Sequence, residues 1–478
     1  MIRTAALALL FGSSLLAAEF RTGQAARAVL GQASFNAHEA GVSAIALVVA
    51  GDRLYAADTA QHTFTFDLSA LGAASDDRAS EQGNGCAACI ATPIAQSAHA
   101  VMPGVAAVST WGKTVAVADA QHHRVLIWRD ATAPRLDRGP DVILGSNAEA
   151  TTGANTLLDP VSVALDGRHL FVGDSALHRI LVWNTLPASD DQPADEVLGQ
   201  QDFVSAAAAE TPAADTVGIP AAMASNGTDL FVADAAANRV LVFSPGDAPL
   251  AREQVANAAS LRPGPLAPGT LLSISAKGLS NESAAVDGES DEALPRELKG
   301  VEVILDGVAL PVVSVSPEEI EALVPPELTA RSAASLYLRI EQDGTVRTTA
   351  ALALKMVPAN PAVFASGGSE PRPGLLLHGA QSAPVTSEYP AHPGEVLTVW
   401  ATGLGAVLEG GLVAAPLTAQ IDGENVSVLS ARQAEHAAGV YEVRIILPAG
   451  MRSRNEPRLA IAQNGLISNT VTFPVTSR

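Results

Sequence analysis

Lysine is scarce in this chain of 478 residues, and that scarcity limits its partners. Lys occurs only at positions 113, 277, 299 and 355, whereas Asp and Glu together number 50, and the formal net charge is −21. Binding to phosphate needs clustered Lys and Arg, so the composition argues against a nucleic-acid partner. An anionic membrane surface would repel the chain for the same reason.

Long apolar runs are missing after the N-terminus, so the sequence predicts no membrane span. Residues 1–18 instead have the pattern of an export signal. Arg3 supplies the positive charge, an apolar stretch runs from Ala5 to Leu16, and Ala17-Ala18 precedes Glu19. Leu16 departs from the small residue preferred there, and a buried first strand or helix is the alternative. We expect a secreted, periplasmic or cell-surface protein.

Cysteine is also rare, with Cys86 and Cys89 as the only two. In an oxidising compartment this spacing predicts a local disulfide. A zinc site would need two further ligands, and none is nearby. Ile90 follows the second Cys where haem attachment needs His, and the loop-like segment 83–85 precedes the pair where a thioredoxin-like site needs a helix.

Catalytic motifs are missing as well: there is no Gly-x-Ser-x-Gly, no Ser-x-x-Lys, no His-Glu-x-x-His and no phosphate-binding Gly loop with Lys. We therefore assign no catalytic residue, metal or cofactor. Paired carboxylates for glycan hydrolysis need no local spacing and remain open. The acidic stretch 287–292 lacks the spacing of an EF-hand, and we interpret it as a solvated loop rather than a Ca²⁺ site.

Aromatic residues are only 4% of the chain, so its cores must be aliphatic. Gly (39) and Pro (30) are plentiful, as expected for many short strands joined by turns. The sequence therefore predicts an all-β protein.

A repeat occupies the first half. Four units share an apolar run, Asp, a short turn, His or Asn, usually Arg, and a second apolar run that ends in an aromatic residue. The units are 54–66, 115–128, 170–183 and 230–243. Further apolar runs precede and follow each core, which predicts four strands per unit, the pattern of a propeller blade.

These units resemble the NHL-repeat family, most clearly in Phe231-Val-Ala-Asp234 followed by Asn238-Arg-Val-Leu-Val-Phe243. The first unit departs, with Thr63 in place of Arg. The resemblance covers about residues 25–246 and implies a four-bladed β-propeller, to which we assign residues 25–250. The segment Val29–Gln32 looks like an outer strand without inner strands, so we expect it to pair beside Val240–Phe243 and complete the last blade.

A second repeat fills the other half. Ala267–Leu279 matches His392–Leu404, and each copy carries an Asp-Gly turn and a later Gln-Asp/Asn-Gly turn. Copies of about 100 residues are typical of immunoglobulin-like sandwiches. This half resembles a C-terminal module of large secreted bacterial proteins of uncharacterised role. We expect two tandem sandwiches, at 255–358 and 362–478.

Repeated polar residues are the candidate site residues, and we interpret them as structural. The aspartates should accept backbone N–H bonds at tight turns, and the His or Asn should adopt a left-handed conformation. The arginines should pack between blades and pair with Asp or carbonyl groups. Alternatives are a metal held by the imidazoles and a carboxylate-binding ring of arginines. The residues are Asp58, Asp119, Asp174, Asp234, His62, His123, His178, Asn238, Arg124, Arg179 and Arg239.

The function predicted from these patterns is that of a non-catalytic binding or scaffolding protein. The propeller face would bind a protein, peptide or glycan, and the sandwiches would be spacers or docking units. The alternative is an extracellular enzyme, either a metal-dependent lyase or a glycan hydrolase, with its site in the propeller channel. Convergence of unrepeated polar residues at one end of the channel would favour the enzyme.

Overall fold

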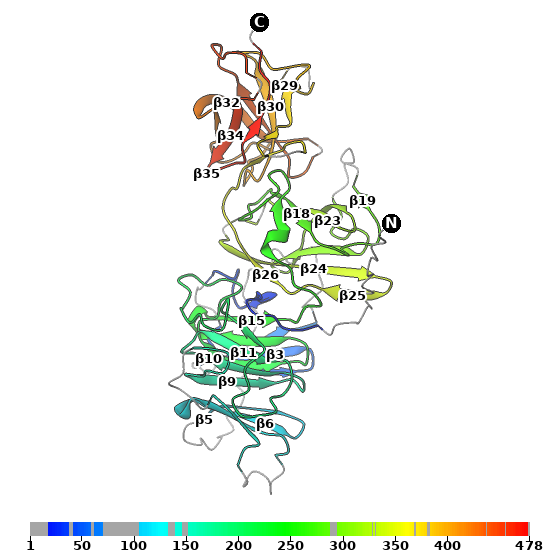
Figure 1. Cartoon of the computed structure of the whole chain (residues 1–478). Helices are drawn as coiled ribbons and strands as arrows, with labels where there is room; N and C mark the ends of the chain where they lie inside the picture. Colours follow the sequence, from blue (N-terminus) through cyan, green and yellow to red (C-terminus); the bar gives the residue numbers. More distant parts are fainter. Residues whose placement is uncertain are drawn as a thin grey trace, which may run out of the picture.

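The structure is a computed structural model in which nearly all regular elements are strands (Figure 1). It describes residues 18–37, 42–58, 62–69, 105–131, 139–145, 152–286, 294–326, 328–329, 331–367, 370–379, 383–435, 437–454 and 456–476. The predicted all-β class is confirmed. Within these residues, no helix has the length and apolar character needed to cross a membrane.

The repeat half folds into four antiparallel sheets, one for each unit. The first contains β2 (Ala44–Ala50), β3 (Arg53–Asp58) and β4 (Thr63–Asp67). The second contains β5 (Val105–Trp111), β6 (Thr114–Asp119), β7 (Arg124–Trp128) and β8 (Val142–Leu144), with the 3₁₀ turn η1 (Ala120–His122). The third contains β9 (Pro160–Leu165), β10 (Leu170–Asp174), β11 (Arg179–Trp183) and β12 (Glu196–Leu198). The fourth contains β13 (Pro220–Ser225), β14 (Leu230–Asp234), β15 (Arg239–Phe243) and β1 (Ala28–Leu30), with η3 (Ala235–Ala237).

The fourth sheet is completed by the N-terminal strand, as predicted. Strand β1 pairs antiparallel with β15, and Val29 lies opposite Leu241. Every residue of β10, β11, β14 and β15 is buried, because both faces of these strands are covered by neighbouring layers. That burial explains why the units read as continuous apolar runs rather than alternating ones.

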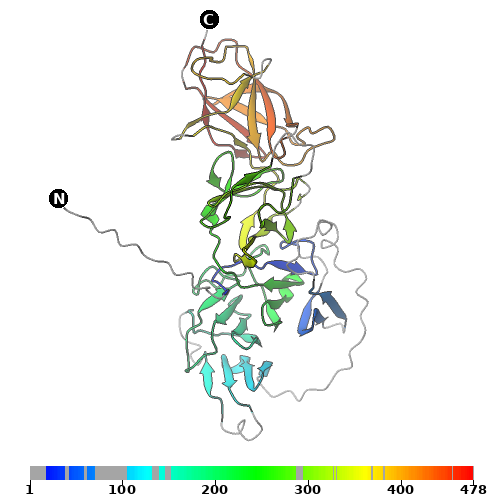
Figure 2. The same ribbon diagram turned by 90° about the vertical axis from the view of Figure 1, so that its right-hand side faces the viewer.

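The four sheets pack face to face in the order second, third, fourth, first. Their inner strands make the contacts, β5 with β9, β9 with β13, and β13 with β2. The sheets form an arc with the first and second at its two ends (Figure 2). The inner strands, which lie closest to one another, line the concave side of this arc.

The segment between residues 255 and 355 forms two sheets around one aliphatic core. One has the order β17 (Arg262–Pro263), β16 (Val255–Asn257), β18 (Leu271–Ser275), β23 (Glu319–Leu323), β22 (Val312–Val315) and β19 (Ala284–Ala285), preceded by η4 (Arg252–Gln254). The other has the order β21 (Val308–Ala309), β20 (Val301–Leu305), β24 (Ala333–Gln342) and β25 (Thr345–Thr348), and β26 (Leu352–Lys355) also pairs with β24.

The last copy is one continuous sheet rather than two separate ones. Its order is β27 (Ala362–Val363), β30 (Val396–Thr402), β33 (Tyr441–Ile446), β32 (Glu424–Gln433), β31 (Thr418–Ile421), β34 (Arg458–Gln463), β36 (Val471–Thr472) and β28 (Arg372–Pro373). Strand β29 (Leu376–His378) pairs with β30, and β35 (Leu466–Ile467) pairs with β34. The ten-residue strand β32 joins the two halves because it pairs with β33 on one side and β31 on the other.

The three parts are stacked along one axis, with the repeat half at one end (Figure 1). The repeat half meets the middle part through a shared core in which Phe20 and Phe35 are buried with Tyr337. Arg27 lies over the Tyr337 ring at 4.6 Å from its centroid. The middle and last parts meet at Thr402, whose hydroxyl donates to the Gly439 carbonyl at 2.6 Å and accepts the Leu271 N–H at 2.9 Å.

Candidate functional site

The repeated aspartates end the second strand of each sheet, and two of them hold the chain that enters the inner strand. Asp174 accepts hydrogen bonds from the backbone N–H groups of Leu158 (2.8 Å) and Asp159 (3.0 Å). Asp234 does the same for Gly218 (3.0 Å) and Ile219 (3.1 Å). These bonds position the starts of β9 and β13.

The repeated histidines bind the same peptides from the neighbouring sheet. Nδ1 of His178 donates to the carbonyl of Gly218 at 2.7 Å, and His123 donates to the carbonyl of Leu158. Each entering peptide is therefore held by an Asp of its own sheet and a His of the preceding one. The backbone is left-handed at His123 and His178, with φ of 57° and 51°, and Asn238 has the same conformation, with φ of 50°.

The repeated arginines differ in burial. Arg239 is 1% exposed, pairs with Asp234 at 3.0 Å and donates to three carbonyls. Arg179 is also buried and donates to the carbonyls of Phe203, Gly153 and Thr156. Arg124 pairs with Asp119 at 2.9 Å, but its side chain is 35% exposed. Their donors are used inside the protein, which leaves little for a shared ligand.

The first two units depart from this pattern. His62 is exposed and bonds to Asp58 of its own turn at 2.9 Å. Asp119 bonds to Arg124 and to the unrepeated His122. Burial raises the pKa of Asp119, but the bonds from His122 and Arg124 outweigh it and hold the pKa below its ordinary value.

Several predicted features lie outside the described residues. These are residues 1–17 of the export signal, the cysteines at 86 and 89, and the acidic stretch 287–292. Within the described ranges, His, Cys, Asp and Glu side chains nowhere gather in a group of three that could hold a metal ion. The repeated histidines are thus spread between sheets rather than brought together.

The inner strands carry no ionisable side chain. The sequences of β2, β5, β9 and β13 contain only Ala, Val, Ile, Leu, Met, Pro, Ser, Thr and Trp. Four of their large apolar residues are about half exposed: Ile45, Val48, Val108 and Trp111. All four belong to β2 and β5, the inner strands of the two sheets at the ends of the arc, so the large exposed side chains of the described inner strands are apolar.

Trp111 is the residue that breaks the repeat most clearly. It ends β5 where the other inner strands end in Ala50, Leu165 and Ser225. It is 48% exposed and lies against Gly167 of the next sheet, where an added Cβ would be 2.3 Å from the indole Nε1. Trp111 was not selected from the sequence, although no other unit has a tryptophan at this position, and that difference could have identified it.

Beside Gly167, a buried acid–base pair holds the turn between β9 and β10. Nδ1 of His169 lies 2.7 Å from Asp166, and both side chains are buried. The His169 ring packs edge-to-face against Phe20, at 5.3 Å between centroids. Burial raises the pKa of Asp166, but bonds from the His169 side chain and from the backbone of His169 and Arg168 hold it below its ordinary value.

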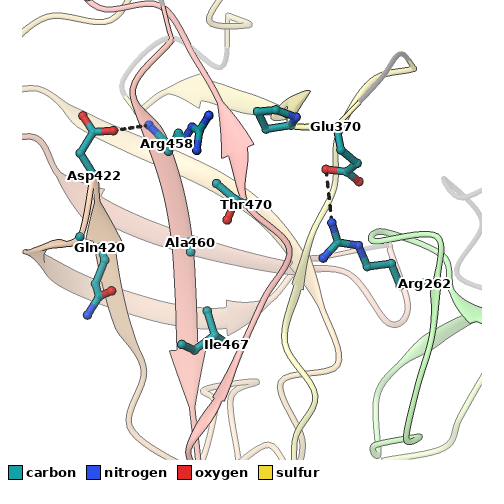
Figure 3. Close-up of a pocket in the computed structure, with 10 residues that line it drawn as sticks. Arg262, Glu370, Gln420, Asp422, Arg458, Ala460, Ile467 and Thr470 are labelled. Carbon is teal, nitrogen blue, oxygen red and sulfur yellow. Dashed lines mark hydrogen bonds and ion pairs between the residues drawn. The ribbon is translucent and has the colours of Figure 1, made fainter.

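Two grooves lie beside equivalent hairpins of the second half. One, of about 510 Å³, adjoins β25 and includes Val346 and Thr349 in its lining. The other, of about 750 Å³, adjoins β35 and includes Ile467 and Thr470 (Figure 3). Val346 and Ile467 hold the same place, two residues after Gly344 and Gly465. The groove at β35 is bordered by two ion pairs, Arg262 with Glu370 and the partly exposed pair of Arg454 with Asp422.

Comparisons with known proteins identify no family. No family model matches the chain, and no curated protein matches it. Among solved structures, the computationally designed Ika4 protein is similar with 14% identity and a TM-score of 0.19, over 45% of this chain and 96% of that one. The extracellular domain of BT4673 from B. thetaiotaomicron has 9% identity and a TM-score of 0.16, over 96% of this chain and 60% of that one. The endo-fucoidan hydrolase MfFcnA4 of glycoside hydrolase family 107 has 11% identity and a TM-score of 0.12, over 48% and 30%. At these TM-scores none of the likenesses supports a fold or a function.

Proposed function

We propose that the chain is a secreted binding protein, built from a four-bladed NHL-like propeller and two immunoglobulin-like sandwich units. The packing of one sheet per sequence unit and the pairing of β1 with β15 support the propeller. The aliphatic core shared by the two sheets of the middle part supports the first sandwich. The separate core of the last part supports a second unit.

The observation that carries the binding function is the composition of the inner strands. A hydrolase or lyase in the channel needs acids, bases or metal ligands that reach the substrate. Strands β2, β5, β9 and β13 offer apolar side chains and hydroxyls instead. A half-exposed tryptophan fixed on a backbone turn is a typical anchor for a ligand, because little entropy is lost when it binds.

The unrepeated polar residues near Trp111 do not favour the alternative, an enzyme. Asp166 and His169 lie on either side of Gly167, which contacts Trp111, and their side chains are only 1% and 7% exposed. They hold the turn on which Trp111 rests. Their burial, with Phe20 packed against the His169 ring, leaves little of either side chain for a substrate to reach.

The test is to screen the purified full chain on glycan and peptide arrays and then to assay the bound compounds for turnover. We expect saturable binding without product. Trp111→Ala and Val48→Ser should weaken that binding, whereas Val204→Ser, at an exposed position outside the inner strands, should not. Release of a product, or metal retained in stoichiometric amount by the active protein, would contradict the proposal.

A further inference from the structure

The edge of β25 lies apart from the inner strands of the repeat half. Among the described residues, β25 is the last strand of its sheet, and β24 is the one strand that pairs with it (Figure 1). The two strands are joined by a tight turn with φ of 50° at Asp343 and 74° at Gly344. In such a hairpin, alternate residues direct their N–H and C=O groups away from the partner strand.

The register identifies which backbone groups face outward. Thr349 N–H donates to Leu338 O, so these two residues form a hydrogen-bonded pair. Val346 opposite Glu341 and Thr348 opposite Arg339 are then the non-bonded pairs. The backbone groups of Val346 and Thr348 therefore point to the open edge.

The chain already uses half of this edge for an added strand. Asp247 donates its N–H to Thr348 O, and its carboxylate accepts the Thr348 N–H, both at 2.7 Å. Ala248 then bridges to Thr349 in parallel orientation. The next outward position along the edge is Val346, which is 48% exposed. An incoming segment would continue a pairing that the protein itself begins.

A cavity next to this position suits an aliphatic side chain. The groove of about 510 Å³ opens beside Val346. Its lining includes Leu250, Leu279, Leu338 and Ile340, all of which are buried members of the middle core. A pocket of this size and character commonly binds an apolar group whose orientation is fixed by a few polar contacts.

The border of the groove is cationic. Lys277, one of only four lysines, is exposed there. The exposed Arg347 reaches across to the Gly278 carbonyl at 3.2 Å. The carboxylate of Asp247 is bonded to Thr348. A chain with a net charge of −21 thus presents two cations beside an open strand edge.

We propose that this groove binds an extended peptide segment, added to β25 as a further strand, with an aliphatic side chain in the cavity and an acidic side chain beside Lys277 and Arg347. Backbone bonds to Val346 supply the pairing, and the cavity and the cations select the sequence. The site does not depend on the concave side of the repeat half, so the peptide site and the proposed function are tested by separate measurements.

The equivalent hairpin of the last part provides a matched comparison. Ile467 also faces an open edge, since Ser468 N–H bonds to Ile461 O and Ala462 lies opposite Ile467. Its groove has no aliphatic floor of this kind and is bordered by ion-paired acids and bases, Glu370 and Asp422 among them. We expect it not to bind the same peptide.

The experiment measures fluorescence anisotropy of fluorescein-labelled Gly-Ser-Val-Leu-Val-Glu-Ser-amide with the full chain. Val346→Pro removes only an outward N–H, which an edge strand tolerates, and should weaken binding about tenfold or more. Ile467→Pro, the same change in the other hairpin, should leave the affinity unchanged. Lys277→Glu should weaken binding of this peptide about fivefold, and the same variant should bind a peptide with Lys in place of Glu as tightly as the wild-type chain binds the original peptide.

Three results would overturn the proposal. They are no saturable binding by the wild-type chain up to about 1 mM peptide, equal binding by a folded Val346→Pro variant, and no exchange of peptide preference in Lys277→Glu. If Val346→Pro lowers the melting temperature sharply, the exchange of peptide preference in Lys277→Glu alone tests the proposal, because that surface substitution does not disturb the sheet. If the wild-type chain binds this peptide but no ligand on the concave side of the repeat half, only the proposed function is contradicted.

Discussion

Replacing Arg239 with Met tests whether the repeated arginines stabilise the sheets as strongly as their burial implies. Met has a similar length and no charge, so it fills much of the same space. The change leaves Asp234 without its ion pair and removes the donor from the carbonyls of Ala213 and Thr216. Asp234 keeps its two bonds from the β13 entry, at Gly218 and Ile219.

The magnitude follows from burial. Removing one partner of a buried ion pair typically costs 3–5 kcal/mol, so we expect about 4 kcal/mol for Arg239→Met. Arg124 occupies the same repeat position, but its side chain is 35% exposed. An exposed pair contributes about 0–1 kcal/mol, so Arg124→Met should cost less than 1 kcal/mol. The difference between the two variants is about 3 kcal/mol.

The assay is thermal unfolding of the full chain, measured by calorimetry so that the transition of the repeat half is resolved from the others. For a unit of 150–250 residues, 1 kcal/mol shifts the melting temperature by about 2–4 °C. Arg239→Met should therefore melt about 6–12 °C below Arg124→Met. Equal melting temperatures for the two variants would refute the claim that burial, rather than repeat position, determines the role of these arginines.

Three further predictions concern the turn beside Trp111 and the segment before β25. Gly167→Ala should displace the Trp111 indole and change tryptophan fluorescence. It should lower the free energy of unfolding by about 1 kcal/mol or more, because a non-glycine residue is strained at φ +91°, and by less in a Trp111→Ala background. The same loss of stability in both backgrounds would contradict the contact. Asp166→Asn should cost about 2 kcal/mol at pH 7. The pKa of Asp166 is lowered in the folded state, so its contribution to the free energy of unfolding is present above the ordinary pKa of 3.8 and is lost as the pH falls through the folded-state pKa. In urea unfolding, the difference in stability between the variant and the wild type should therefore become smaller in acid. A difference that stays constant with pH would contradict this prediction. Fragment 247–478 should be about 2 kcal/mol more stable than fragment 255–478, because Leu250 is buried in the middle core and Asp247 bonds to Thr348; melting curves that coincide would show that this segment does not stabilise the second half.

The strands of the repeat half were predictable because the same pattern of apolar runs and turn residues recurs in each unit. Counting outer-strand motifs was enough to predict that Val29 lies beside β15, since an unmatched strand at one end and a missing one at the other can complete the same sheet. The positive φ at His178 and Asn238 also follows from residue type and position.

The partners of the repeated side chains were not predictable from local sequence. His178 donates to Gly218, which is 40 residues away and belongs to the next sheet. Burial also separates residues that look identical in the repeat, because Arg239 lies between layers whereas Arg124 lies in a sheet at the end of the arc. Such differences come from the position of a unit in the stack, which the repeat pattern does not contain.

The continuous sheet of the last part was missed for a related reason. The sequences of the two copies predict similar turns, but the pairing of β32 with both β31 and β33 depends on how long that strand remains extended. The groove at β25 was likewise not predictable, since part of its lining comes from Asp247 to Leu250, a segment that precedes the second repeat.

We propose that the concave side of the repeat half binds a ligand without transforming it. Amide hydrogen exchange of the full chain, measured with and without a compound selected on the arrays, tests it most directly. We expect added protection in β2, β5, β9 and β13 and in the turn at Gly167, with the compound recovered unchanged. Protection confined to other strands, or conversion of the compound during the exchange, would contradict it.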